Sequence, residues 1–281
     1  MLVYLNGQYV PYDSACVHVE DRGYLFGDGI YEMVRAYGGR PFLLKEHLDR
    51  LVRSAKELNI ALPNTPEEFG QIALTLMEKN GVRDAAIYIQ VTRGAAPRSH
   101  AFPTKAEPGV LVLVREGKST DPALRESGIK VITTPDQRWS RCDIKSLNLL
   151  ANVLAKQKAM EAGAYDAILI KDGIAIEGSS SNFFGVFGGV IVTYPRSHKI
   201  LAGVTRGFVV DLARKLGYQV REEAIAADRL DWADELFLSG TMTEILPITS
   251  VDGRPVGDGR AGPIAKHLHA EFRKVAESGV F

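Results

Sequence analysis

Tight-turn signals separate this chain into short strands, and they constrain its fold more than any other feature. "NG" at 6–7, "DG" at 28–29 and "GG" at 38–39 lie between runs rich in β-branched and aromatic residues. Two further runs turn at Asp172-Gly173 and at Gly188-Gly189. Two-residue loops of these types join antiparallel strands in hairpins. The sequence therefore predicts largely antiparallel sheets.

Helical periodicity appears between these strands. Apolar residues repeat at helical spacing in 44–59, and Pro66 opens a second such run over 66–79. Further helices are expected from directly after Lys145 to about residue 162, and over 205–217. Because strands and helices alternate without a regular βαβ period, we expect an α+β fold with packed helices.

A polar, turn-rich stretch, "EGKSTDP" at 116–122, is the best candidate for an interdomain linker. It follows strands expected at 85–93 and 109–115 and precedes one expected at 129–133. We therefore expect two domains: a small N-terminal α/β domain over 1–115, and a larger C-terminal domain over 123–281 that carries Lys145.

Charge and composition argue against several classes of function. The chain has 34 Lys and Arg against 34 Asp and Glu, so no net field draws nucleic acid or an anionic membrane. Its apolar runs are too short to span a bilayer, and its start lacks the pattern of a signal peptide. Two cysteines, Cys16 and Cys142, form neither a disulfide framework nor a metal site. We expect a cytoplasmic protein without a metal.

Lys145 is unusual for its place in the sequence. It follows apolar Ile144 and precedes the expected helix, whose N-terminus disfavours a cation. One interpretation is a surface lysine whose stem covers apolar neighbours. The other is a lysine whose pKa is lowered by burial and the helix, so that its neutral amine is a nucleophile suited to Schiff-base chemistry.

The stretch "IEGSSSNFFG" at 176–185 places Glu177 at the end of an apolar strand, before three serines. Such residues can be an exposed strand end and its turn. A carboxylate beside several hydroxyls is also suited to hold a protonated ring nitrogen, as a pyridoxal phosphate (PLP) site requires. Together with Lys145, this pattern suggests PLP.

Three other segments offer groups for an anion. Gly203 and Val204 lead into Thr205 at a helix start, where free N–H groups can bind phosphate, although most such turns are plain caps. "LSGTMTE" at 238–244 presents Thr241, and Arg50 lies beside the apolar row of its helix.

A loop between Pro97 and Pro103, in "TRGAAPRSHAFP", presents Arg98 and His100. Two cationic side chains two residues apart make a plausible trap for a carboxylate. An ordinary surface loop with a lone histidine has the same spacing, so both interpretations stay open at this point.

Taken in order, these motifs resemble a family. "EDRGYLFGDGIYEMVR", "EHLDRL", "VTRGAAPRSHAFP", "RCDIKSLNLLANVLAKQKA", "EGSSSNFFGV" and "GVTR" span most of the chain and are similar to those of fold-type IV PLP-dependent aminotransferases. The Arg-x-His loop resembles the D-amino acid branch of that family. The resemblance implies a two-domain fold and transamination between a D-amino acid of the D-alanine type and a 2-oxo acid, 2-oxoglutarate or pyruvate.

The resemblance also implies a role for each position. Lys145 would form the Schiff base with PLP and carry out the 1,3-proton transfer, and Glu177 would keep the ring nitrogen protonated. Tyr31, Arg98 and His100 would bind substrate, the last two reaching over from the neighbouring subunit of a homodimer. The other residues implied to bind the cofactor are Arg50, Ser180, Leu201, Val204, Thr205 and Thr241. Gly240 departs from the pattern, because relatives commonly carry a hydroxyl there, and Met33 and Met242 would make the substrate pocket differ.

Two alternatives remain. A branched-chain L-amino acid aminotransferase or aminodeoxychorismate lyase would share the Lys and Glu motifs but not the Arg98–His100 loop. A non-catalytic binding protein could keep the same fold, and it would be colourless and unchanged by borohydride.

Overall fold

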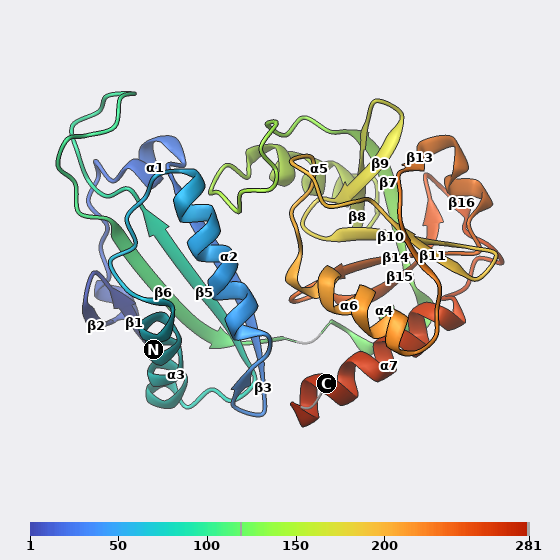
Figure 1. Cartoon of the computed structure of the whole chain (residues 1–281), viewed down its shortest axis with the longest axis horizontal. Coiled ribbons are helices and arrows are strands. Elements are labelled where there is room, and N and C mark those ends of the chain that lie inside the picture. Colours follow the sequence, from blue (N-terminus) through green and yellow to red (C-terminus); the bar gives the residue numbers. More distant parts are fainter. Residues whose placement is uncertain (119, 280–281) are drawn as a thin grey trace. The chain divides into compact units, whose positions relative to one another are not determined.

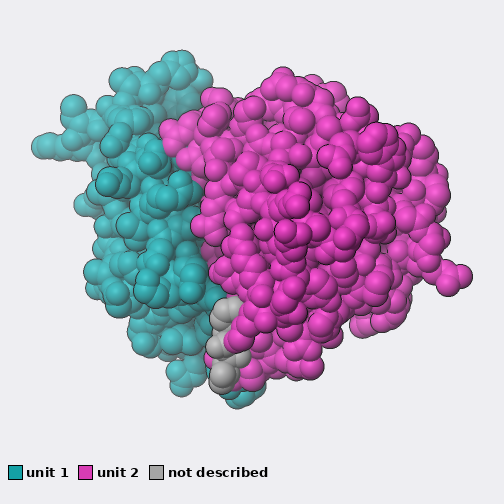
Figure 2. Space-filling view, turned by 45° about the vertical axis from the view of Figure 1, so that its right-hand side comes forward, with its two compact units in different colours: residues 1–118, 144–148 teal, residues 119–143, 149–281 magenta. Residues whose placement is uncertain are grey.

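The computed structural model describes residues 1–118 and 120–279, and these form two compact units, shown in different colours in Figure 2. The first unit contains residues 1–118 and 144–148, and the second contains 119–143 and 149–281. Ser119, within the predicted linker, and residues 280–281 of the predicted C-terminal domain lie outside the described residues.

The first unit is built on a six-stranded sheet in the order β2-β1-β6-β5-β3-β4, with neighbouring strands antiparallel. Its helices α2 and α3 pack against one face of this sheet (Figure 1). The elements are β1 Leu2–Leu5, β2 Gln8–Pro11, α1 Arg22–Phe26, β3 Gly29–Tyr37, β4 Arg40–Pro41, α2 Leu44–Glu57, α3 Pro66–Asn80, β5 Ala85–Thr92 and β6 Gly109–Glu116.

Alternation along these strands explains which face is covered. Buried Ala, Ile and Val residues occupy alternate positions of β5 and β6, in one core cluster with Leu51 and Phe69 of the helices. The opposite face carries half-buried residues, among them Tyr31 and Met33 of β3. Period-two burial is expected for a sheet with helices on one side only.

The second unit contains a ten-stranded sheet in which six strands close into a ring. The path runs β12-β11-β10-β14-β15-β7-β8-β9-β13, and β9 also pairs with β10. Most pairs are antiparallel, but β7 pairs in parallel with both β8 and β15. The ring strands are β7 Ile129–Pro135, β8 Asp166–Lys171, β9 Ile174–Gly178, β10 Asn182–Phe187, β14 Glu235–Gly240 and β15 Glu244–Val251.

Helices α4 to α7 pack against these strands, α6 on β14, α7 on β14 and β15, and α5 on β8 (Figure 1). A core of buried aliphatic and aromatic side chains fills this unit. The remaining elements are α4 Pro122–Ser127, α5 Leu150–Glu161, β11 Val190–Thr193, α6 Val204–Lys215, β12 Val220–Glu222, β13 Ile225–Ala226, β16 Arg254–Pro255 and α7 Pro263–Ser278.

The expected α+β class and antiparallel sheets are confirmed, with corrections to local elements. Four of the five predicted turns join hairpin strands; the exception is Asp28-Gly29, which follows the short helix α1 and leads into β3. The helix predicted directly after Lys145 begins five residues later, at Leu150. Residues 144–148 belong with the first unit, whereas the predicted domains placed Lys145 in the C-terminal one. The division at 116–122 itself stays a prediction.

Candidate active site

Lys145 lies in an extended segment that runs along the start of β3. The backbone N–H of Tyr31 donates to the carbonyl of Lys145 at 3.0 Å, and that of Leu147 donates to the carbonyl of Gly29 at 3.0 Å. Lys145 is half-buried, and its Nζ lies 4.3 Å from the centroid of the Tyr31 ring. The structure thus brings the predicted lysine and tyrosine together.

The electrostatic argument for Lys145 from a helix N-terminus was wrong. The residues between Lys145 and Leu150 are not helical, so the macrodipole of α5 does not act on the lysine. The apolar row after Lys145 is also largely exposed, with Leu150 73% and Leu154 55% accessible. Its spacing resembled a core-facing helix, but only Ala155 and Ala159 of α5 are buried.

Arg50 belongs to a buried ionic network that the sequence reasoning missed. Its Nε and Nη2 donate to the two carboxylate oxygens of Glu32 at 2.7 and 2.8 Å, and His47 Nδ1 lies 2.8 Å from the same carboxylate. Glu32 is fully buried. Burial by itself raises the pKa of Glu32, but Arg50 and His47 outweigh it and lower that pKa to about 2. Arg50 is therefore held in one orientation on α2.

Sequence spacing contains a signal for this network. Glu32 interrupts the buried face of β3 at the second residue after Ile30, where a charge is unexpected without a partner. His47 and Arg50 are three residues apart on α2, on the face that packs against β3. A charge on an otherwise apolar strand face, opposite a His-x-x-Arg helix, could have indicated the pairing.

Arg98 and His100 are both exposed on the loop that follows β5. The His100 ring lies 5.6 Å from the Phe26 ring, and the Arg98 guanidinium lies 5.1 Å from the same ring. The two predicted trap residues are therefore neighbours in space, gathered on one aromatic side chain of α1.

In the second unit, Glu177 lies where β9 and β10 close the ring of strands, opposite Asn182. Glu177 is 4% exposed, not the exposed strand end that one interpretation allowed. One oxygen accepts from Asn182 Nδ2 and from the backbone N–H of Leu201, each at 2.8 Å, and the other pairs with Arg138. Burial raises the pKa of Glu177 to about 7, against the opposing effect of Arg138.

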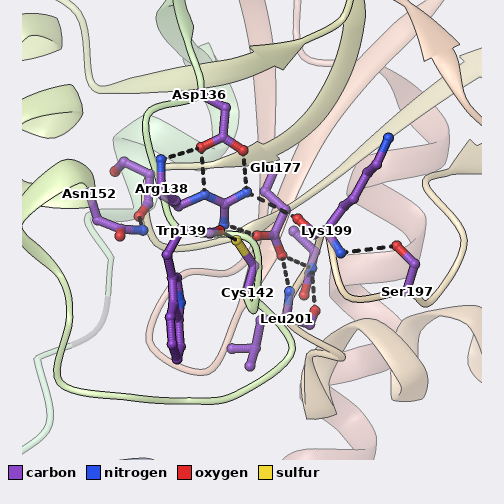
Figure 3. A network of polar contacts seen from close by, with 11 residues as sticks. Asp136, Arg138, Trp139, Cys142, Asn152, Glu177, Ser197, Lys199 and Leu201 are labelled. Atoms are coloured by element: carbon purple, nitrogen blue, oxygen red, sulfur yellow. Dashed lines mark hydrogen bonds and ion pairs between the residues drawn. The ribbon is translucent and has the colours of Figure 1, made fainter. Parts of the chain in front are cut away.

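Arg138 is a second residue that the sequence reasoning missed. Its Nε and Nη2 each contact the carboxylate of Asp136 at 2.9 Å, while Nη1 faces Glu177 (Figure 3). Asp136 therefore competes with Glu177 for the same guanidinium. Arg138 lies shortly after a strand, in "TPDQRW", and it gives no local sign that its partner lies 39 residues ahead.

The serines after Glu177 divide by burial. Ser179 and Ser181 are buried and donate to Asp166 of β8, so they fasten this turn. Ser180, the one predicted to bind cofactor, is exposed. Its carbonyl lies 3.8 Å from where a Cβ on Gly240 would be, so the turn after Glu177 and the end of β14 are adjacent.

Helix α6 offers an uncapped N-terminus. Its N-cap is Gly203 and no side chain caps it, whereas the sequence suggested that the helix starts at Thr205. The first N–H groups of a helix have no partner within the helix, so those of Val204 and Thr205 are available to an anion. A Cβ on Gly203 would lie 1.9 Å from Asn182 Oδ1, so a glycine lets the helix start close to the residue that holds Glu177.

Thr241 and Leu201 flank this arrangement. Thr241 is half-buried in the turn between β14 and β15, and Leu201 is half-buried, tied to Glu177 through its N–H and to Asn182 through its carbonyl. At Gly240 a Cβ would meet nothing closer than 3.7 Å, so the missing hydroxyl reflects no lack of space. Met33 and Met242 are half-buried.

A family model described as "Amino-transferase class IV" matches residues 29–251. The chain belongs to the class IV aminotransferases. The resemblance inferred from the motifs is thereby confirmed, and the enzyme's α+β fold is that of its solved relatives. Class IV aminotransferases use PLP.

Relatives of this class IV aminotransferase match over nearly its whole length. "D-alanine aminotransferase" of Staphylococcus epidermidis is 44% identical and covers 98% of each chain. That of Bacillus licheniformis is 43% identical over 97% of this chain and 96% of its own. The crystal structure of Escherichia coli branched-chain amino acid aminotransferase has a TM-score of 0.95, 28% identity and coverage of 100% and 96%. A branched-chain amino acid aminotransferase of T.th., solved with pyridoxamine 5′-phosphate, has a TM-score of 0.92, 32% identity and coverage of 99% and 94%.

Within the residues described, no helix is both long and apolar enough to cross a membrane. The same residues contain no group of three or more His, Cys, Asp or Glu side chains that could hold a metal ion.

Proposed function

We propose that this enzyme transfers the amino group between a D-amino acid of the D-alanine type and a 2-oxo acid such as 2-oxoglutarate or pyruvate. The observation that carries the proposal is the pairing of Arg98 and His100 on one aromatic ring, which gives two neighbouring cationic groups for a carboxylate. The relatives named D-alanine aminotransferase support it.

Several groups in the second unit support a PLP site. Glu177 is a buried carboxyl with a pKa raised to about 7, basic enough to attract a proton on an adjoining ring nitrogen, and Leu201 lies beside it. The uncapped N-terminus of α6 suits a phosphate through Val204 and Thr205. We assign Thr241, Ser180 and Arg50 to the same phosphate. When bound, PLP supplies an aldehyde and an electron-withdrawing ring.

Lys145 is the group we assign to covalent attachment and to proton transfer. Its Nζ stands over the Tyr31 ring and in the half-buried environment of the sheet face. With PLP bound, Lys145 would be the residue that attaches to it, and its amine, when free and neutral, would move a proton to or from the substrate Cα. Tyr31, next to it, is placed to contact the substrate.

Arg98 and His100 would fix the α-carboxylate and so decide which α-hydrogen faces Lys145. With the amino group directed to the cofactor and the α-hydrogen to Lys145, a fixed carboxylate leaves only one enantiomer correctly placed, and we propose that this is the D-form. We further propose that the loop acts across the interface of a homodimer. We also propose that the enzyme is cytoplasmic.

A branched-chain L-amino acid activity is the alternative, because the similar solved structures include branched-chain aminotransferases. These are 28% and 32% identical to this chain, whereas the relatives named D-alanine aminotransferase reach 44%. The Arg98–His100 pair also favours the D-amino acid. Aminodeoxychorismate lyase activity has no observation in its favour.

The test is a coupled assay of PLP-loaded protein with D-alanine and, separately, L-leucine, each with 2-oxoglutarate. We expect turnover of D-alanine, and turnover of L-leucine alone would contradict the proposal. Lys145→Ala should abolish activity and the attachment of cofactor by borohydride, while Lys156→Ala, on α5, keeps both. A wild-type protein that binds no PLP would instead support a non-catalytic binding protein.

A further inference from the structure

The segment "EDRGYLFGD" at 20–28 holds no group assigned to cofactor or substrate, yet its arginine is firmly held. Arg22 is 3% exposed, and its Nε donates to Asp28 Oδ2 at 2.8 Å. Asp28 also accepts two hydrogen bonds from Arg93, from Nε to Oδ2 at 2.8 Å and from Nη2 to Oδ1 at 3.0 Å. Two guanidinium groups thus converge on one carboxylate at the base of the loop that follows β5.

The other end of the Arg22 guanidinium contacts the loop itself. Nη1 donates to the carbonyl of Ser99 at 2.5 Å and lies 3.4 Å from that of Ala101. These are the two residues on either side of His100. A guanidinium has several donors in a fixed plane, so it can hold two carbonyls and a carboxylate in one geometry.

Phe26, at the end of the same helix, contacts the side chains of the loop. Its ring lies 4.8 Å from the Arg22 guanidinium, 5.1 Å from that of Arg98 and 5.6 Å from the His100 ring. The position of Phe26 is fixed, because α1 is capped by Asp21 and ends at Gly27 in the left-handed region. Contact of cations with an aromatic face is favourable, so the ring attracts both guanidinium groups.

The ends of the loop are also tied to α1. The N–H of Arg22 donates to the carbonyl of Gly94 at 2.9 Å, and Asp21 forms a bridge with Ala95. Arg93 stacks on Phe102 at 3.6 Å. Between these ties, residues 98–102 are exposed. Their conformation would be costly in entropy to fix from within the loop, so contacts from α1 are needed to hold it.

We propose that Arg22 and Phe26 are positioning residues of the carboxylate site: Arg22 holds the backbone on both sides of His100, and Phe26 holds the side chains of Arg98 and His100 together. The inference rests on the proposed function of that pair. This role would explain the "EDRGYLFGD" segment. The segment contains α1 and lies directly before β3, the strand that carries Tyr31.

The experiment compares Arg22→Lys and Phe26→Leu with a control, Arg115→Lys. Arg115 is an exposed arginine of the first unit that donates to Tyr12 Oη at 3.0 Å, with its guanidinium 5.2 Å from the Tyr12 ring. Steady-state kinetics with D-alanine and 2-oxoglutarate are measured beside the affinity for PLP. The rate of reaction with methoxyamine, a nucleophile without a carboxylate, is measured on the same samples.

In both loop variants we expect KM for both substrates to rise about tenfold or more, with kcat changed less than about threefold. PLP affinity and the methoxyamine rate should match the wild type, and Arg115→Lys should match it throughout. Unchanged KM in both variants overturns the inference. A rise in KM that is accompanied by a loss of PLP affinity and a slower methoxyamine reaction also overturns it, because that result would show a structural role only.

Failure of the proposed function gives a different result. If wild-type protein binds PLP but turns over no D-amino acid, the positioning is judged by trypsin cleavage after Arg98. Faster cleavage in Arg22→Lys and Phe26→Leu than in Arg115→Lys supports it, and equal cleavage overturns it.

Discussion

Glu32, Asp28 and Glu177 are carboxyl groups that meet arginines inside the protein, and their pKa values differ because their partners differ. Burial raises each of them. Glu32 faces Arg50 through both oxygens and His47 besides, and its pKa falls to about 2. Asp28, between Arg93 and Arg22, also has a lowered pKa. Glu177 shares its one arginine with Asp136, and its pKa rises to about 7. Glu32 and Asp28 each face two cations and have lowered pKa values, whereas at Glu177 burial outweighs the arginine that it shares.

The Glu32 network predicts acid sensitivity. Because the folded-state pKa of Glu32, about 2, lies below its ordinary 4.5, the stabilisation is complete above about pH 5 and is lost as the pH falls toward 2. It amounts to about 3 kcal/mol. Glu32→Gln should flatten the pH dependence of unfolding in that window and cost about 3–5 kcal/mol at pH 7, since Arg50 loses its partner.

Urea unfolding of the PLP-free protein between pH 3 and pH 7 measures this. Glu46→Gln, an exposed position on the same helix, is the control and should follow the wild type. An identical pH dependence in Glu32→Gln and wild type would contradict the assignment.

Substitution of Glu177 should lower the rate of reaction without unfolding the protein. Glu177→Gln keeps the shape of the side chain but cannot take a proton, so kcat should fall by about 100-fold, a typical contribution of one positioned acid or base. The exposed Glu223→Gln is the matched control. Single-turnover rates with D-alanine check the prediction, and a rate within a few-fold of wild type would refute the assigned role.

At the level of elements, the start of α6 and the closure of the strand ring depend on each other. Asn182 bonds to Glu177 and to the Leu201 carbonyl, and it packs where a Cβ on Gly203 would be. The φ of Gly203 is −61°, so its glycine is required by space and not by backbone conformation. The helix N-terminus and the carboxylate are thereby fixed together within the second unit.

Two alanine substitutions in α6 should therefore act in opposite directions. Gly203→Ala forces Asn182 to move and should cost about 1–3 kcal/mol of stability and weaken PLP binding. Gly207→Ala lies inside the helix, where its Cβ meets only the end of Arg196 at 3.1 Å, and should add about 0.5–1 kcal/mol. Thermal unfolding of the two PLP-free variants decides, and a stabilised Gly203→Ala would show that the contact with Asn182 is unimportant.

At the level of the whole molecule, the proposed homodimer predicts complementation between two inactive variants. If Arg98 acts on the neighbouring subunit's Lys145, a hybrid of Lys145→Ala and Arg98→Met subunits has one complete site. Random mixing makes half the dimers hybrid, so activity should recover to about a quarter of wild type. The two variants are mixed after mild unfolding and assayed with D-alanine; either variant mixed with itself is the control. No recovery in a mixture shown to contain hybrids would place the loop and the lysine in one subunit.

Local patterns predicted the elements whose physics is local. The strands β5 and β6, the helices α2 and α3, and four of five hairpin turns follow from propensities and spacing of residues close in sequence. The pattern failed after Lys145, where apolar spacing suggested a buried helix face and the structure leaves Leu150 and Leu154 exposed. The spacing of apolar residues indicates a helix, but the face that is buried depends on which segments pack against that helix.

The sequence by itself determined the class of fold and the class IV motifs, and it predicted Lys145 and Glu177 as the residues for PLP chemistry. Only the tertiary structure decided how they are held: Lys145 by pairing with β3 instead of by a helix start, Glu177 by Arg138, and the Arg98–His100 loop by Arg22 and Phe26. The physical reason is sequence separation. These partners lie from 39 to more than 100 residues apart, so no local propensity or periodicity records them, and only the folded chain brings their charges and rings into contact.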